Sequence, residues 1–262
     1  MVKKIIISIT LTIAVLAFPV RLLGFTQNIE AVAKIVKGVI FITLLFILMN
    51  REQFVQRRKT LRIIPIKILI RLLPVILGIC AYVIYFWNND LKNFDGSIGF
   101  LFLTLTGTFI AASAEEVVFR GYLFNLFKKN DYSLLKSLIL SSVIFSLVHI
   151  ANAFRVEDAW AVCNQIIFAF ALGMLLGSVY ALTNNLLLVC IFHFLINIPS
   201  SVKRITVSTA NDPPILGSNL SEELLSTLFF IILMLPVLML GFYYINIIKK
   251  NDATLPPDKL TC

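Results

Sequence analysis

Long apolar runs, separated by short polar segments, recur along the chain from its first residues to its last turn. A helix rises about 1.5 Å per residue and the hydrocarbon core of a bilayer is about 30 Å thick, so a spanning helix needs roughly 20 mostly apolar residues. The pattern therefore predicts an all-α fold, a polytopic membrane helical bundle in which the fifth and seventh spans are short. Eight spans are expected, near residues 4–23, 31–49, 68–87, 98–127, 137–151, 161–182, 185–200 and 223–248.

The same pattern bears on domain organisation. A length of 262 residues would be enough for two soluble domains, but no polar interval is long enough to form a second folded unit. The N-terminal run begins with charges, as a signal peptide does, yet no small-x-small cleavage site precedes Arg21, which favours a retained first span. We expect a single integral-membrane domain over residues 1–262.

The composition excludes a soluble protein. Hydrophobic residues make up 59% of the chain and charged residues 14%, against about 45–50% and about 25% in soluble domains. The net charge of +9 does not indicate a nucleic-acid partner, because the basic residues lie in short clusters between apolar runs, where they determine membrane topology. The expected partner is the lipid bilayer, and no nucleic acid.

These basic clusters also predict the orientation of the chain. They lie at residues 51–71, at residues 128–136 and in the tail at Lys249 and Lys250, all on one side of the predicted bundle. The opposite connections are poorer in Lys and Arg. Because cytoplasmic loops carry the excess of these residues, both termini should be cytoplasmic.

Two motifs bear on helix packing. Gly173 and Gly177 form a G-x-x-x-G pattern in the sixth span, which predicts the close approach of another helix. The sequence TNN at residues 183–185 predicts a tight turn into the seventh span.

Three charged residues lie inside the fourth span, in the stretch SAEEVVFRGYLF. A charged side chain at the middle of the bilayer costs about 2.5–3.5 kcal/mol on insertion scales, so such residues usually have a function. Glu116 and Arg120 are four positions apart on one helical face and can form an ion pair. Glu115 points about 100° away and needs another partner.

Both histidines of the chain, His149 and His193, also lie inside apolar runs, and Asn197 follows His193 by one helical turn. One such histidine is more often a satisfied core residue, but two of them together with Glu115 favour a functional site. Counted from the cytoplasmic helix ends, Glu115, His149 and Asn197 lie about 18 Å deep and His193 about 12 Å deep, at about 1.5 Å per residue. Polar groups at similar depth on three helices predict one site that faces a cavity within the bundle.

These residues stand in three motifs. EEVVFR, FSLVH and HFLIN resemble the E-E-x-x-x-R, F-x-x-x-H and H-x-x-x-N motifs of the CAAX protease and bacteriocin-processing family (CPBP, also called Abi), and they place the motif-bearing core at residues 98–200. The resemblance implies an intramembrane endopeptidase, related to the enzymes that remove the last three residues of prenylated CAAX proteins. Its expected substrate is a membrane-anchored or hydrophobic peptide, and its expected location is the plasma membrane of a bacterium.

The resemblance also implies roles for individual residues. Glu115 would be the general base and His149 its partner in activating water, while His193 and Asn197 would bind the oxyanion. Glu116 and Arg120 would give structural support.

A zinc site is the main mechanistic alternative, since Glu115, His149 and His193 could ligate the metal with water in the fourth position. The chain lacks H-E-x-x-H, and its only other carboxylate nearby, Glu116, is expected to pair with Arg120. A site without a metal or other cofactor is therefore favoured.

Two other functions stay open. A family member could serve as a non-catalytic immunity or regulatory scaffold, although the motifs are intact. A proton-coupled transporter also uses intramembrane Glu and His residues, but the chain shows neither repeats nor paired broken helices.

Overall fold

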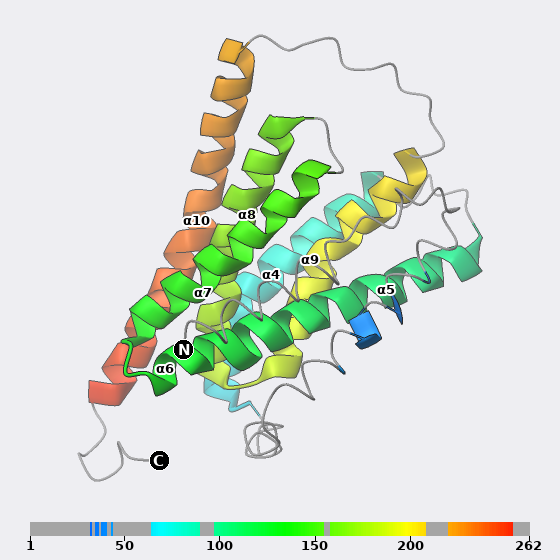
Figure 1. The fold of residues 1–262 in the computed structure, drawn as a ribbon. Coiled ribbons are helices and arrows are strands. Elements are labelled where there is room, and N and C mark those ends of the chain that lie inside the picture. The colour runs from blue at the N-terminus through cyan, green and yellow to red at the C-terminus, as the bar shows by residue number, and fades with distance from the viewer. Residues whose placement is uncertain are drawn as a thin grey trace.

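The computed structural model describes residues 32, 35–36, 38–40, 43, 64–89, 97–154, 158–207 and 220–253. Within these ranges the chain is helical and contains no strand, and Figure 1 shows the helices packed as a bundle. Helices suit a bilayer because they satisfy every backbone N–H and C=O within one segment. The predicted all-α bundle is confirmed.

The spans predicted from residue 68 onward each correspond to helical structure. Five segments are long and apolar enough to cross a membrane: Ile66–Trp87, Ile98–Lys129, Leu134–Ala153, Ala159–Thr183 and Leu220–Lys250. The seventh predicted span is a shorter apolar helix over Leu186–Val202. The span predicted at 4–23 lies outside the described residues, as does most of the span at 31–49, so the count of eight and the cytoplasmic termini stay predictions.

The helices have the following bounds. The first fully described helix is α4, Ile66–Asn89, and it is followed by α5, Ile98–Glu116. The remainder are α7, Leu134–Val148; the 3-10 helix η5, His149–Phe154; α8, Ala159–Thr183; α9, Leu186–Val207; and α10, Leu220–Ala253.

Side chains cap four of these helices at their N-termini, including α9, where Asn185 accepts a hydrogen bond from Leu188 N. Ser97 accepts a hydrogen bond from Phe100 N at the start of α5, and Ser133 accepts one from Lys136 N at the start of α7. Asp158 does the same for α8 through Trp160 N. These bonds satisfy N–H groups that have no partner in the first turn of a helix.

The fourth predicted span is confirmed as one helical segment, Ile98–Lys129, but it is not a regular α-helix throughout. After α5, the chain forms a π-helix, η4, over Val117–Phe124 and then a short α-helix, α6, over Asn125–Lys129. A π-helix has i→i+5 hydrogen bonds, is rare, and often occurs at functional sites. Here it begins directly after the two adjacent glutamates.

The long helices form two groups. In one group α8 packs against α7 and α10, and in the other α9 packs against α5 and α4. Contacts between the groups include those of η4, which touches α7, α8 and α9. Figure 1 shows α8 and α9 diverging from the turn that joins them.

That turn is the one predicted at residues 183–185. Asn184 adopts a left-handed conformation, with φ of 50°, and its N–H donates to the carbonyl of Tyr180. Left-handed residues commonly end helices, and Asn tolerates this conformation better than most residues. The prediction of a tight turn is confirmed.

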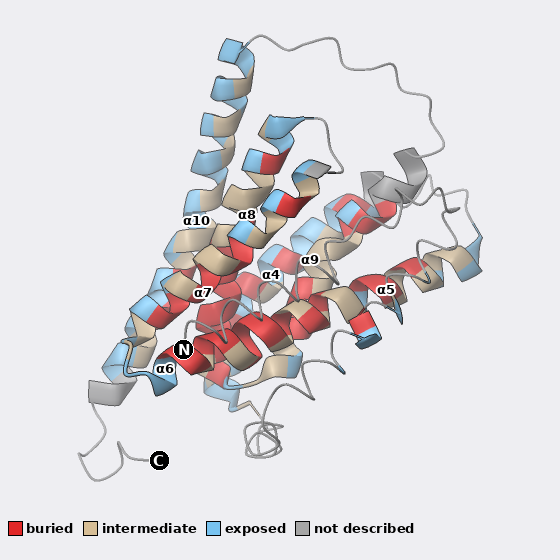
Figure 2. Ribbon diagram, in the orientation of Figure 1, coloured by how far each residue is buried: buried red, intermediate tan, exposed pale blue. Residues whose placement is uncertain are grey.

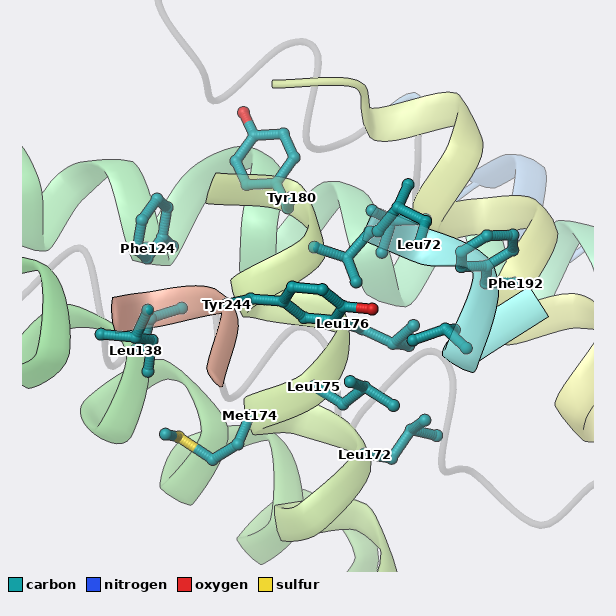
Figure 3. Close-up of a cluster of buried hydrophobic side chains, with 14 of the residues drawn as sticks. Leu72, Phe124, Leu138, Leu172, Met174, Leu175, Leu176, Tyr180, Phe192 and Tyr244 are labelled. Atoms are coloured by element: carbon teal, nitrogen blue, oxygen red, sulfur yellow. The ribbon is translucent and has the colours of Figure 1, made fainter. Parts of the chain in front are cut away.

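Buried side chains gather where the helices cross (Figure 2). One cluster joins α4, η4, α7, α8, α9 and α10, and Figure 3 shows members of it around Tyr244 and Leu176. The outer faces of α4 and α10 instead expose large apolar side chains such as Ile84, Phe229 and Met239. Such faces suit contact with lipid, and the chain is an integral membrane protein.

The packing role predicted for Gly173 and Gly177 is confirmed. A Cβ atom on Gly173 would lie 3.0 Å from Ser142 Cβ and 3.2 Å from Ser142 Cα. A Cβ atom on Gly177 would lie 2.8 Å from Leu138 Cδ2. Both glycines therefore let α8 approach α7 closely, as small residues do in membrane bundles.

We expect Gly173→Ala to destabilise the protein more than Gly177→Ala. The methyl group at position 173 would press on the backbone of α7, whereas Leu138 Cδ2 is the end of a flexible side chain and can rotate away. Overpacking costs about 1–3 kcal/mol, so Gly173→Ala should lose this much and Gly177→Ala about 1 kcal/mol or less. Unfolding of both variants in the same detergent measures the difference, and equal losses would contradict this account.

Candidate active site

Glu116 and Arg120 form the predicted ion pair. Arg120 Nη1 lies 2.6 Å from Glu116 Oε1, and the two side chains are 1% and 0% exposed. Arg120 Nη2 also donates to the backbone carbonyl of Gly173, at 3.1 Å, and the guanidinium lies over the Phe145 ring, 4.7 Å from its centroid. Arg120 therefore connects η4 to both α7 and α8.

His193 of α9 binds the same carboxylate. Its Nδ1 lies 2.7 Å from Glu116 Oε1, and its side chain is 3% exposed. An ionised carboxylate only accepts hydrogen bonds, so Nδ1 carries a hydrogen and donates it. One oxygen of Glu116 thus serves both Arg120 and His193, and the other, Oε2, is buried without a partner among the described residues.

Glu115 lies on the other side of the His193 ring. Its Oε2 is 3.7 Å from His193 Nε2, and its side chain is 23% exposed, whereas Glu116 is fully buried. The two adjacent glutamates therefore have different environments. Glu116 fixes the orientation of the imidazole, and Glu115 is the acid that a ligand can reach.

His149 begins the 3-10 helix η5 and is half-buried. Its Nδ1 lies 3.0 Å from the carbonyl oxygen of Phe145. Because a carbonyl only accepts, Nδ1 is the donor, which leaves a lone pair on Nε2. The ring is therefore held in the tautomer that can accept a proton.

The Phe145 ring lies between the two histidines. Its centroid is 5.1 Å from that of His149 and 5.8 Å from that of His193, and both contacts are edge-to-face. Phe119 packs against the same ring at 5.0 Å. The phenylalanine of the F-x-x-x-H motif thus forms a wall that both imidazoles contact.

The structure differs from the expected pairing of Glu115 with His149. Among the described residues, no ion pair or hydrogen bond joins these two side chains, and the imidazole nearest Glu115 is that of His193. The backbone carbonyl of Phe145 binds His149 instead. Any joint action of Glu115 and His149 must therefore pass through a molecule that contacts both.

Asn197 follows His193 by one turn of α9 and is half-buried. Its backbone carbonyl accepts a hydrogen bond from Ser200 Oγ at 3.1 Å. The described part of the chain supplies no hydrogen bond to its carboxamide. Its side-chain N–H groups can therefore donate to a ligand.

The proposed zinc ligands do not converge. Among the described residues, no three His, Cys, Asp or Glu side chains are grouped closely enough to hold a metal ion. Glu116 and the Phe145 carbonyl hold Nδ1 of His193 and of His149, which leaves Nε2 of both rings free. In this conformation the side chains of Glu115, His149 and His193 do not lie close enough together to share a metal ion.

Three features of the site were not predicted from the sequence. These are the bond from His193 to Glu116, the bond from Arg120 to the Gly173 carbonyl, and the π-helix itself. Asn125 helps to hold the end of this π-helix, because its side-chain amide lies 2.6 Å from the carbonyl oxygen of Arg120 and 3.3 Å from that of Gly121. In the sequence, Asn125 was the one residue that could have indicated the π-helix, and an Asn near a helix junction indicates it only weakly.

Known proteins are similar to the part of the chain that contains these residues. Residues 97–199 match the family described as Type II CAAX prenyl endopeptidase Rce1-like. The chain is also 28% identical over 178 residues to CAAX prenyl protease 2 of Methanococcus maripaludis, a match that covers 61% of this chain and 65% of that protein. The chain therefore spans just under two thirds of the length of that curated relative. No solved structure matches the chain significantly.

The segment that matches the family begins at Ser97, the N-cap of α5, and ends within α9. It contains both glutamates, Arg120, both histidines and Asn197. Over this core, the chain is therefore similar to the Rce1-like CAAX prenyl endopeptidases and to a CAAX prenyl protease.

Proposed function

We propose that this protein is an intramembrane endopeptidase that hydrolyses a peptide bond of a membrane-associated peptide near the cytoplasmic leaflet. One observation carries the proposal: Glu115, partly exposed, faces an imidazole that the buried Glu116 holds in place, and both glutamates lie in a helical segment long and apolar enough to span a bilayer. Charged groups at this depth are costly and usually serve a function. The CAAX prenyl protease named above supports this class of reaction.

We assign water activation to Glu115 and His149. Glu115 is the accessible carboxylate, and His149 has a free lone pair on Nε2. Since no bond joins them directly, a water molecule bonded to both is the proposed nucleophile. A base must lie within about 2.6–3.2 Å of the proton it removes, or act through one water.

The proton can then pass to His193. Glu115 takes it from water as the hydroxide attacks the carbonyl carbon, and His193 Nε2, 3.7 Å from Glu115 Oε2, can receive it. The imidazole then holds hydrogen on both nitrogens, so Nε2–H can donate to the oxyanion while Nδ1–H stays on Glu116. When the C–N bond breaks, the same proton goes to the leaving amine.

Asn197 supplies the second donor to the oxyanion in this proposal. Removing one such donor typically lowers kcat by about 10²–10³-fold. We expect Asn197→Leu to show a loss of this size with little change in KM. Ser200→Ala, one turn further along α9 and exposed, is the matched control and should retain activity. A large rise in KM with unchanged kcat would instead indicate that Asn197 binds the substrate in its ground state.

The substrate class follows from the family and the membrane location. A membrane-anchored or hydrophobic peptide is expected, prenylated or not, and the bacterial plasma membrane remains the predicted location. To test this, the purified protein is reconstituted in liposomes with a farnesylated CAAX peptide or the same peptide without the lipid. Mass spectrometry should show loss of the last three residues from one or both peptides, and an absence of cleavage of either by folded protein would refute the proposal.

The proposed mechanism uses no metal ion. We therefore expect the reconstituted protein to keep its activity after dialysis against EDTA. Elemental analysis of the purified protein checks the same point independently. Stoichiometric zinc that is lost together with activity would show that Glu115 is a ligand and not the base.

A further inference from the structure

A pair of carboxamides beside the catalytic residues has no role in the mechanism above. Asn152 Nδ2 in η5 donates to Gln165 Oε1 in α8, at 2.9 Å, and both side chains are half-buried. Both residues lie in segments apolar enough to span a membrane. Polar side chains in such segments face the bundle interior or a cavity and commonly mark the path of a substrate.

The bond between the two amides leaves two hydrogen-bonding groups without a partner among the described residues. Asn152 keeps its carbonyl oxygen, an acceptor, and Gln165 keeps its NH₂ group, a donor. Neither atom is among the buried atoms without a partner, which in this region include only Asn164 Oδ1. If both amide groups were rotated by 180°, the pair would still present one donor and one acceptor.

An adjacent donor and acceptor complement a peptide group. Each peptide unit carries one N–H and one C=O, both of which need partners when they are removed from water. An extended substrate inside a membrane protein has no water to satisfy them. The Asn152–Gln165 pair can form hydrogen bonds with the main-chain N–H and C=O of a substrate, and these bonds do not depend on the identity of the substrate's side chains.

Asn152 lies three residues after His149 in η5. In a 3-10 helix, side chains at i and i+3 eclipse, with a rise of about 2 Å per residue, so Asn152 lies above His149 on the same face by about 6 Å. An extended peptide advances about 3.3 Å per residue. The pair is therefore about two residues from the bond that His149 helps to cleave.

Resting on the proposed function, we propose that Asn152 and Gln165 form a subsite that binds one main-chain peptide group of the extended substrate, about two residues from the cleaved bond. Their mutual hydrogen bond keeps each amide oriented before the substrate arrives. The subsite would select an extended backbone and tolerate different side chains at this position.

Ester substitution in the substrate tests the subsite. In the farnesylated peptide, each main-chain amide within three residues of the cleaved bond is replaced in turn by an ester, which removes the N–H. With the wild-type protein, one ester about two residues from that bond should lower kcat/KM about tenfold, as expected for about 1.4 kcal/mol of lost binding. In Asn152→Leu the penalty for that ester should fall to about twofold or less, because Asn152 Oδ1, the acceptor of that N–H, is already absent. Gln165→Leu removes a donor and not this acceptor, so it should keep most of the penalty.

The ratio of ester to amide turnover is taken on one preparation, so it does not depend on the folded fraction of a variant. Asn164→Leu, on the neighbouring residue of α8, is the matched control and should keep the full penalty. The subsite would be overturned if no ester position lowered kcat/KM of the wild type more than the others did, or if the penalty were unchanged in Asn152→Leu. Failure of the wild type to cleave the all-amide peptide would instead refute the proposed function, and the subsite with it.

Discussion

Replacing Glu115 with glutamine is expected to lower kcat for peptide cleavage by about 10²–10⁴-fold, the usual contribution of a positioned general base. Glutamine keeps the shape of the side chain but cannot take a proton from water. Since Glu115 is partly exposed and its side chain makes no hydrogen bond to another described residue, only a 3.7 Å contact with His193, folding should be little affected. The measurement is kcat with the farnesylated CAAX peptide, alongside unfolding in the same detergent.

Glu222→Gln provides the matched control, because Glu222 is an exposed glutamate in the first turn of α10. It should retain wild-type kcat. The same variants separate proteolysis from a scaffold role in cells. A Glu115→Gln protein that accumulates normally and keeps its full cellular effect would favour the non-catalytic scaffold.

Replacing Arg120 with methionine is expected to lower the free energy of unfolding by about 3–5 kcal/mol, the typical cost of removing one partner from a buried ion pair. The Glu116 carboxylate would remain, fully buried, with His193 as its sole partner among the described residues. The bonds from Arg120 to the Gly173 carbonyl and the Phe145 ring would be lost as well. The unfolding midpoint in detergent, with the extent of proteolysis by trypsin, measures the loss.

A double-mutant cycle separates the charge from the packing. Glu116→Gln in the Arg120→Met background removes the uncompensated charge, so the double variant should be more stable than the sum of the two single losses predicts. Arg120→Lys keeps the positive charge but not the fork of donors, and it should lie between wild type and Arg120→Met. Strictly additive losses would show that the pair contributes little as a unit.

The sequence predicts much of this fold because the bilayer imposes a simple rule. A spanning helix must be apolar over roughly 20 residues, and the apolar runs after residue 68 coincide with α4 to α10 within a few residues. The Glu116–Arg120 pair was predictable for a similar reason, since i and i+4 side chains are neighbours on any helix. Local rules of this kind need no knowledge of the other helices.

The contacts of His193 could not be predicted from such local rules, because they depend on how α5 and α9 are placed relative to each other. Glu115 and Glu116 are adjacent, and which of them meets a residue from α9 depends on how α5 is rotated about its axis. The sequence favours Glu115 as the acid without a partner, whereas His193 lies between the two carboxylates and is closer to Glu116. The π-helix alters the register immediately after this point, and nothing in the periodicity of VVFRGYLF indicates it.

The tight turn between α8 and α9 limits how these two helices can separate. Asn184 and Asn185 tie their ends together, whereas the start of α8 and the end of α9 have no such link to each other. Opening would therefore be a rotation about the turn, with displacement that grows along each helix. His193, about 11 Å from the turn at about 1.5 Å per residue, would move little, and Gln165, about 27 Å away, would move more. We expect long peptides to enter from the wide end, while the bond to be cut comes to rest near the pivot.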